Sequence, residues 1–394
     1  MLATAVLIVK DEAASICATL RTCCDAVDAI VVLDTGSSDG TPAVISEWAQ
    51  HAPVPVYLHK EPFVAQTHAA TAGLIDFAAT RNRALDLAAA TDPIFTLTLS
   101  ADETLIGGAA LRRFLADAAH GAEPAYCVAL RSGALSWTYP RVLRRAAQWR
   151  FIGAVHEVPV DADGNSGGPT IPDCAIRHAA SDPARHRARL ANFDLPTLTW
   201  MAEEGNLGLR LRAINYLAQT HLMLAEGYPQ EPGSPWIYHK LAAMAHYRRV
   251  VELGQSVTDA ASRAAVNNAA VLYLNIAEAA QLYSDDELLR RLRPLLSADP
   301  DSPEVNYMVA AHAARLDVRD GAYAALRAAK VAAQARVQPR SIPTDTRLEW
   351  LSYRLVAACA RELKQPALVR HAMQRGLAAG APPTAFAEFA GESA

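Results

Sequence analysis

The sequence lacks long apolar runs. None of its uninterrupted apolar stretches reaches the roughly 20 residues that a membrane-spanning helix needs. The first nine residues are apolar, but they lead directly into Lys10-Asp11-Glu12, without a basic leader or a small-residue cleavage site. We therefore expect a first β-strand here, no signal peptide and no integral membrane segment.

Cysteine is scarce, and its pattern excludes two kinds of site. The six cysteines have no metal-ligand spacing, and the adjacent Cys23 and Cys24 cannot easily bridge each other. Reduced thiols in a cytoplasmic protein are the simplest interpretation.

Charge of one sign is also lacking, since 37 Lys and Arg stand against 41 Asp and Glu, a net charge of -4. This balance gives no general attraction to nucleic acid or membranes. Arginine is nevertheless clustered in two stretches. Such clusters are usually solvated faces, although arginine-rich loops also hold diphosphates. The clusters contain Arg131, Arg141, Arg144, Arg145 and Arg150, then Arg177, His178, Arg185, His186, Arg187 and Arg189.

The first 190 residues alternate short apolar runs with helical patterns, which predicts an α/β domain, residues 1–200, with a mostly parallel sheet and right-handed crossovers. Loops after the strand ends should line one crevice, and Asp34, Asp39 and Asp102 lie in such loops. Residues 60–73 predict a mobile loop and residues 164–172 a turn. The predicted strands are residues 5–9, 29–33, 54–59 and 94–99, and the predicted helices are residues 12–22, 41–50 and 75–90.

Past Asn206 the pattern changes to successive alanine- and leucine-rich helices. Helix pairs are predicted near residues 208–253, 261–297, 302–335 and 344–379, each about the 34 residues of a tetratricopeptide repeat or longer. Residues 206–394 thus predict a helical solenoid. A bundle without repeats is the alternative.

Six ordered segments of the first part carry a resemblance. A β-branched strand that stops at an acidic, glycine- and serine-rich turn, VVLDTGSSD at residues 31–39, is typical of a nucleotide site. In this order and spacing the segments resemble the family 2 glycosyltransferases of the GT-A fold, and the branch with an appended tetratricopeptide domain is most similar. They are VLIVKDEA (6–13), IVVLDTGSSDGT (30–41), IDFAATRNRAL (75–85), LSADETL (99–105), RVLRRAAQWRFIGAVHE (141–157) and IRHAA (176–180).

The residues that bind the nucleotide of the sugar donor are expected at the ends of strands. Glu12 and Asp34 can accept hydrogen bonds from the ribose hydroxyls and the base N–H of a nucleotide sugar, and the resemblance implies the same. The alternative is that Asp34 and Asp39 only cap their turn and helix.

The resemblance places an Arg-Asn pair, here Arg81 and Asn82, near the donor phosphates or the acidic cluster, with Asp76 a weaker candidate. A surface arginine followed by a helical asparagine is the alternative. Ser100-Ala101-Asp102 is expected to contact the donor as well.

Asp102 is the expected ligand of a divalent Mn or Mg ion, because such ions prefer carboxylate and phosphate oxygens. The chain departs here from the family's usual Asp-Ala-Asp-Glu, since Ser100 replaces the first acid and removes a negative charge. The resemblance implies that His178 completes the metal site or contacts the diphosphate. The alternatives are a structural histidine and a helix-capping Asp102.

Glu157 is the expected catalytic base, with His156 orienting it or touching the donor sugar. The competing hypothesis has His156 on the diphosphate and Glu103 or another acid as the base. Three aromatic residues in the preceding segments could stack on sugars or belong to the core. They are Trp137, Tyr139 and Trp149.

These features predict a metal-dependent inverting glycosyltransferase that uses a nucleotide sugar, with UDP-glucose the expected donor, and a protein or glycan acceptor. The helical half could select the acceptor or pair two copies of the chain. Two alternatives are a nucleotide-sugar-binding scaffold that has lost turnover, suggested by Ser100, and a helical adaptor with a vestigial enzyme domain.

Overall fold

The computed structural model describes residues 1–179, 182–231, 233–258 and 260–392. Ala180, the last residue of the IRHAA segment, lies outside them. The chain divides into two compact units. Unit 1 comprises residues 1–133 and 138–216, and unit 2 comprises residues 134–137 and 217–394. Unit 1 is α/β and unit 2 is mainly helical, which confirms the predicted succession of an α/β part and a helical part. The predicted boundary between residues 200 and 206 stays a prediction.

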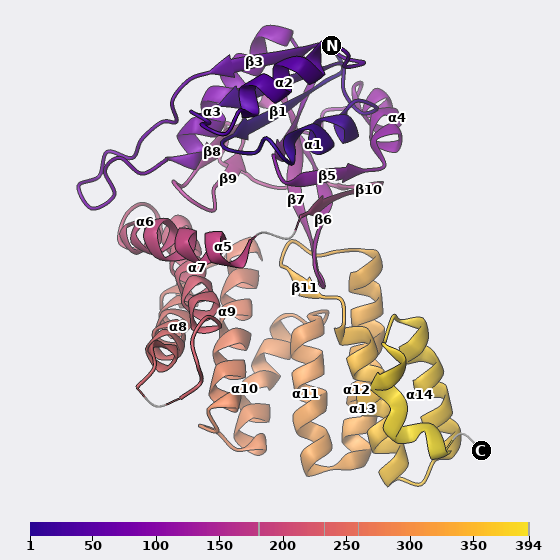
Figure 1. Ribbon diagram of the computed structural model, residues 1–394. Helices are drawn as coiled ribbons and strands as arrows, with labels where there is room; N and C mark the ends of the chain where they lie inside the picture. The colour runs from indigo at the N-terminus through magenta and orange to yellow at the C-terminus, as the bar shows by residue number, and fades with distance from the viewer. Residues whose placement is uncertain (180–181, 232, 259, 393–394) are drawn as a thin grey trace. The chain divides into compact units, whose positions relative to one another are not determined.

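One sheet forms the centre of unit 1 (Figure 1). Its first four strands run in the order β3-β2-β1-β4 and are all parallel. The order continues with β7, β6, β10 and β5. The strands are β1 (Ala3–Val9), β2 (Ala29–Asp34), β3 (Val56–Lys60), β4 (Phe95–Ser100), β5 (Glu103–Ile106), β6 (Ala125–Ser132), β7 (Leu135–Arg144) and β10 (Thr170–His178).

The prediction of a mostly parallel sheet is wrong for the second half, which is mixed. β7 is antiparallel to β4, and β5 is antiparallel to β10, whereas β6 and β10 are parallel. β6 and β7 are joined by only two residues, Gly133 and Ala134, and neighbouring strands with so short a connection must be antiparallel. Gly133 has a φ of 56°, a left-handed conformation that glycine adopts at little cost.

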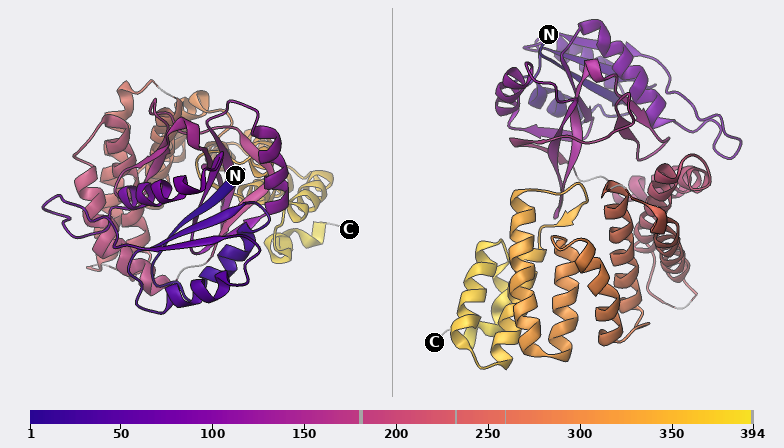
Figure 2. Two further views of the ribbon diagram at one scale, coloured as in Figure 1. Left: turned by 90° about the horizontal axis from the view of Figure 1, so that it is seen from above. Right: turned by 180° about the vertical axis from the view of Figure 1, so that it is seen from behind.

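Helices cover both faces of the four parallel strands. The chain passes from β1 through β2 to β3 on one side of β1, and then returns to β4 on the other side. Because each crossover is right-handed, the change of direction also changes the face that the connecting helix covers. One face carries α1 (Ile16–Cys23) and α2 (Thr41–Ala49), and the other carries α3 (Phe77–Ala88) (Figure 2). Leu85 of α3 packs with the buried Val31 and Leu33 of β2. Full burial of one such side chain stabilises the fold by about 1.5–3 kcal/mol.

The limits of two predicted elements differ by three or more residues, and the predicted loop has a buried anchor. Residues 12–15 form a turn, so that α1 begins at Ile16 instead of residue 12. Residues 170–172 of the predicted turn already belong to β10. The segment of residues 60–73 contains no regular element after Lys60, as expected, but Gln66 is buried and its amide donates to Ile75 O and Thr197 Oγ1. This loop is therefore anchored in the structure at Gln66.

The remaining elements of unit 1 are short. α4 (Gly108–Ala118) packs near β10, and β8 (Arg150–Ile152) pairs with β9 (Val158–Val160). A helical stretch follows, consisting of α5 (Pro183–Arg189), a π-helical turn at Leu190–Asp194 and α6 (Leu195–Met201). Single 3-10 turns occupy Ala89–Thr91 and Arg145–Ala147. All six cysteines are free thiols.

The helices after residue 206 come in antiparallel pairs, and the four predicted pairs are confirmed (Figure 1). Serine side chains cap three of them, since Ser234, Ser284 and Ser302 each accept a hydrogen bond from a first-turn N–H. The helices are α7 (Leu207–Ala225), α8 (Pro235–Leu253), α9 (Ala260–Ala279), α10 (Asp285–Ala298), α11 (Pro303–Leu316), α12 (Val318–Val337), α13 (Leu348–Glu362) and α14 (Pro366–Ala378). Among the described residues, no helix is long and apolar enough to cross a bilayer.

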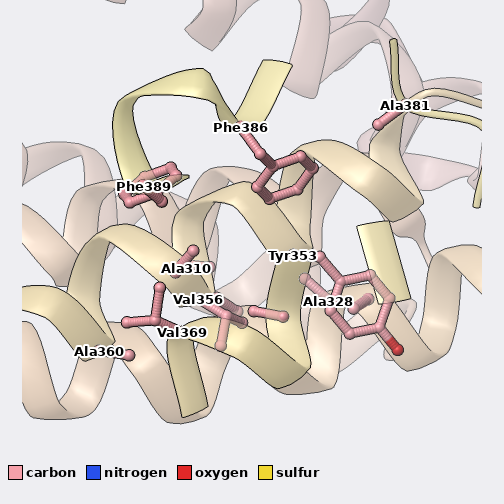
Figure 3. Packing of buried hydrophobic residues seen from close by; sticks show 13 residues of the cluster. Ala310, Ala328, Tyr353, Val356, Ala360, Val369, Ala381, Phe386 and Phe389 are labelled. Atoms are coloured by element: carbon pink, nitrogen blue, oxygen red, sulfur yellow. The ribbon is translucent and has the colours of Figure 1, made fainter. Parts of the chain in front are cut away.

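The largest described cluster of unit 2 joins its last four helices to the C-terminal 3-10 segment Pro383–Glu392 (Figure 3). Phe386 and Phe389 are buried against Val356 and Val369. The short β11 (Thr344–Asp345) pairs with Ser136 and Leu135, both of which belong to unit 2. Gly254–Ser256 forms one further 3-10 turn.

Candidate functional site

The carboxyl ends of β1, β2 and β4 bring the predicted donor residues together. β1 lies between the other two strands, with Val9 opposite Asp34 and Ile8 opposite Ser100. The order of the strands changes direction at β1, because the chain places β2 and β3 on one side of β1 and then β4 on the other, with all four strands parallel. In parallel sheets this switch point, at the carboxyl edge, is where ligands bind.

Asp34 keeps one carboxylate oxygen available at this edge. Its Oδ1 accepts hydrogen bonds from the N–H groups of Gly36 and Ser37, both at 3.0 Å, and thereby shapes the turn after β2. Its Oδ2 is buried and has no hydrogen-bond partner among the described residues. A buried acceptor without a partner is costly, so this oxygen is suited to a ligand N–H or O–H.

The loop after β1 is tied to the loop after β2. The N–H of Asp11 donates to Ser37 Oγ, and the N–H of Glu12 donates to Thr41 Oγ1 at 2.8 Å. Asp39 accepts from Ala13 N and from both the N–H and the hydroxyl of Thr41. The Thr41 hydroxyl and these N–H groups lower the pKa of Asp39. Asp39 therefore holds the turn before α2, one of the alternatives that the sequence left open, whereas the N-cap residue of α2 is Gly40.

Glu12 follows the end of β1. Its Oε2 accepts a hydrogen bond from Ser15 Oγ at 2.6 Å. Its other oxygen lies 3.9 Å from the exposed guanidinium of Arg185 on α5. Glu12 thus has capacity to accept further hydrogen bonds at the strand edge.

Arg81 on α3 reaches the same edge. Its guanidinium forms an ion pair with Glu157, and its Nη2 lies 3.4 Å from Ser100 Oγ. Burial alone would raise the pKa of Glu157, but Arg81 outweighs that effect and lowers it, so the carboxylate is ionised at neutral pH. Tyr139 Oη donates to the main-chain oxygen of Glu157 at 2.7 Å.

The amide of Asn82 has a main-chain partner. It donates to Phe151 O at 2.9 Å and accepts from Phe151 N at 2.7 Å, which fixes β8 to α3. Asp76 caps α3 by accepting from Ala79 N. Both side chains therefore have structural contacts, and the predicted contact of Asn82 with the donor stays a prediction.

Glu103 is fully buried under the strand ends. It accepts from Arg141 at 2.5 Å, from Ser100 N at 2.7 Å and lies 2.9 Å from His178 Nε2. Burial would raise the pKa of Glu103, but Arg141 and His178 outweigh it and hold it at about 2. An enclosed carboxylate with three partners is a poor base for an external substrate, which favours Glu157 over the Glu103 alternative.

Asp102, the expected metal ligand, follows β4 together with Ala101. Its main-chain oxygen accepts from Ala179 N at 2.9 Å, which places it beside His178, and its half-buried carboxylate accepts no hydrogen bond from the described part of the chain. Within residues 1–179, 182–231, 233–258 and 260–392 no three His, Cys, Asp or Glu side chains group to hold an ion. His178 Nε2 is engaged by Glu103. The residues present fit an ion held by one carboxylate and by ligand oxygens.

His156 sits next to Glu157 in a constrained backbone. Its φ is 49°, and its ring stacks on that of Tyr216 with centroids 3.9 Å apart and an interplanar angle of 4°. Burial, assisted by the positive charges of Arg212 and Arg189, lowers the pKa of His156 to about 3, so the ring is neutral at pH 7. Arg212 and Tyr216 were missed by the sequence analysis, because they lie on the first helix of the region assigned to a repeat.

Most residues of the first arginine cluster have protein partners. Arg141 binds Glu103, Arg144 binds main-chain oxygens, Arg145 binds Asp92, and Arg150 binds Asp86. Arg131, Arg177 and Arg187 are exposed. Trp149 is buried and donates to Pro124 O, so it belongs to the core.

Comparisons with known proteins give fold-level similarity only. No family model and no curated protein matches the sequence. Residues 1–349 of S. aureus TarS are 12% identical, with 86% of this chain and 92% of that chain covered and a TM-score of 0.35. The mannosyltransferase PcManGT from Pyrobaculum calidifontis, in complex with GDP-Man and Mn2+, is 17% identical, with 75% and 85% covered and a TM-score of 0.38. A putative kinesin light chain from Podosopora anserina with TPR-like repeats is 11% identical, with 50% and 90% covered and a TM-score of 0.34. TM-scores this low carry no argument about function.

Proposed function

We propose that the chain is a metal-dependent inverting glycosyltransferase that transfers a sugar, glucose from UDP-glucose, to a protein or glycan acceptor in the cytoplasm. The observation that carries the proposal is the buried Oδ2 of Asp34 at the switch point of the sheet, which has no hydrogen-bond partner in the described part of the chain. Together with Glu12 it offers acceptors for the ribose hydroxyls and the base N–H of a nucleotide. The motif resemblance supports the same chemistry.

The proposed mechanism is a single displacement. Glu157, ionised at neutral pH, accepts the proton of the acceptor hydroxyl. The hydroxyl oxygen forms a bond to the anomeric carbon while the bond from that carbon to the diphosphate breaks, and the electron pair leaves with the diphosphate. The contact of Arg81 Nη2 with Ser100 Oγ supports a role for both as hydrogen-bond donors to the departing oxygens.

A divalent Mn or Mg ion would be held by Asp102 and would neutralise charge on the diphosphate. His178 would support the site indirectly, through Glu103. Helical repeats present extended surfaces of the kind that bind peptides, so we assign acceptor selection or pairing of two copies to unit 2.

A second candidate is a nucleotide-sugar-binding scaffold without turnover. Two observations favour it: Ser100 stands where the resemblance expects an acid, and the carboxylate of the proposed base is paired with Arg81. Neither observation affects Glu12 and Asp34, the proposed nucleotide-binding residues, so only an activity measurement separates the two functions.

The deciding experiment measures nucleoside diphosphate release from a panel of UDP- and GDP-sugars, with and without Mn2+, alongside a thermal shift for each ligand. At about 100 times its dissociation constant a ligand should stabilise the fold by about 2.7 kcal/mol. Stabilisation with Mn-dependent release supports the transferase. Stabilisation without release across a wide acceptor panel supports the scaffold, and no stabilisation by any donor would refute both.

A further inference from the structure

The segment that carries the proposed base has an unusual backbone. Gly153–Glu157 connects β8 to β9, and His156 within it has a φ of 49°. Left-handed conformations cost free energy for residues other than glycine and persist only where their surroundings hold them. Gly153 also has a positive φ, of 91°.

Two side chains of α7 meet this segment directly. The Nε of Arg212 donates to the main-chain oxygen of His156 at 2.9 Å. The ring of Tyr216 stacks on the imidazole of His156. Residues four apart lie on the same face of a helix, so α7 presents both groups together.

The two α7 side chains also order each other. The guanidinium carbon of Arg212 lies 5.0 Å from the centroid of the Tyr216 ring, and its Nη2 is 3.5 Å from Tyr216 Oη. No carboxylate within the described chain forms an ion pair with Arg212 in the structure. Its main-chain bond to His156 is the shorter of its two hydrogen bonds to described residues.

From these contacts we propose that Arg212 and Tyr216 are positioning residues, which hold His156 and thereby fix the carboxylate of Glu157 at the site. This inference rests on the proposed function for its catalytic consequence. Both residues fall within unit 1, which extends to Tyr216, so the start of α7 belongs structurally with the α/β fold. A catalytic domain ended between residues 200 and 206 would lack both.

The test uses the full chain and compares variants that keep or remove each contact. Tyr216→Phe keeps the stacked ring, whereas Tyr216→Leu removes it. Arg212→Ala removes the bond to His156. Arg210→Ala is the matched control, because Arg210 lies on the same helix and its Nε also donates to a main-chain oxygen, that of Ala202.

Three quantities are measured: the rate of nucleotide release at saturating donor, the donor dissociation constant by calorimetry, and the NMR resonance of His156, assigned with a His156→Gln variant. We expect the rate to fall at least 10-fold in Tyr216→Leu and Arg212→Ala, with the dissociation constant changed less than threefold. Tyr216→Phe and Arg210→Ala should stay within twofold of the wild type. The His156 resonance should lose its ring-current shift in Tyr216→Leu but keep it in Tyr216→Phe.

Failure of the inference and failure of the function can be told apart. A wild-type rate in both Tyr216→Leu and Arg212→Ala, or an unchanged His156 resonance in Tyr216→Leu, overturns the positioning role. A wild type that binds donors but never releases the diphosphate overturns the transferase. In that case the His156 resonance still decides whether these residues order the segment.

Discussion

The guanidinium of Arg81 and the carboxylate of Glu157 form an ion pair between residues 76 positions apart in the sequence. Each side chain is only 14% exposed, so each depends on the other for compensation of its charge. Arg81 comes from α3 and Glu157 from the connection between β8 and β9. The pair therefore joins the proposed base to the helix that faces the donor edge.

Replacing Glu157 by Gln should separate binding from turnover. The amide can still accept a hydrogen bond from Arg81, so we expect the donor dissociation constant to change less than threefold. Diphosphate release should fall by roughly 10²–10⁴, the typical contribution of a general base. Glu61→Gln is the control, because Glu61 pairs with Arg83 on the same helix at an exposed position. Normal turnover by Glu157→Gln would show that another group is the base.

Replacing Asp34 by Asn should weaken the binding of the nucleotide. The amide oxygen can keep the bonds from Gly36 and Ser37, but the NH2 group replaces the acceptor Oδ2. A lost hydrogen bond to a charged group costs about 1.5–3 kcal/mol, so UDP affinity should fall roughly 10- to 100-fold by calorimetry. Asp39→Asn makes the same chemical change in the turn before α2 and should leave UDP affinity within twofold. Equal affinities for the two variants would contradict the role of Asp34.

The sequence predicted the parts that depend on local pattern. Asp34 and Ser100 are the last residues of strands that are otherwise apolar or β-branched, so their position at the strand ends could be predicted from periodicity and turn residues. The helix pairs after Asn206 could be predicted because each helix contains its own apolar spacing, and several begin at a capping residue such as Ser234, Ser284 or Ser302. These features need no knowledge of distant contacts.

What the sequence could not predict depends on register between distant strands. β10 pairs with β5 so that His178 lies opposite Glu103 and contacts this buried acid, while its predicted place in the metal site stays a prediction. Arg212 and His156 are 56 residues apart, and no local spacing indicates that they meet. Such contacts are decided by tertiary packing.

Replacing Ser100 by Asp should restore a carboxylate beside Asp102. The added charge should tighten Mn2+ binding severalfold, since hard cations favour sites with more carboxylate oxygens. Arg81 lies 3.4 Å from Ser100 Oγ and would be drawn toward the new carboxylate. Ser100→Asn is the control of similar shape without charge. Manganese titrations with UDP present check this, and equal affinities in the two variants would place the ion elsewhere.

Gly321→Ala should destabilise the helical unit. A Cβ at this position would lie 2.3 Å from the Cα of Ala314, so α11 and α12 would have to separate. Overpacking of this kind costs about 1–3 kcal/mol, which outweighs the gain of up to about 1 kcal/mol in helix propensity. Gly208→Ala is the control, because a Cβ there makes only an ordinary contact with Asn206. Denaturant unfolding followed by helical circular dichroism measures both, and a Gly321→Ala variant as stable as the wild type would refute the close approach.

Acid should destabilise the chain through a histidine pair. Nδ1 of His221 lies 2.9 Å from Nδ1 of His239, and the ring of His221 also stacks on that of His246. The ring of Tyr238 also contacts His221, and the ring of Tyr228 stacks on His239. Burial, then the charges that His246 and His239 would carry, lower the pKa of His221 to about 4.

Because the pKa of His221 in the folded state is below its ordinary value of about 6.5, the unfolded chain binds more protons between pH 4 and 6.5. Stability from this group is therefore full above pH 6.5 and falls as the pH drops toward 4, by about 3 kcal/mol at 1.36 kcal/mol per pKa unit. The measurement is urea unfolding at several pH values for the wild type and for His221→Asn. Subtracting one curve from the other removes the contributions of other acidic and histidine groups, including His156. The difference should grow steadily more favourable to His221→Asn as the pH falls, and a difference that does not change between pH 7 and 4.5 would show that His221 titrates normally.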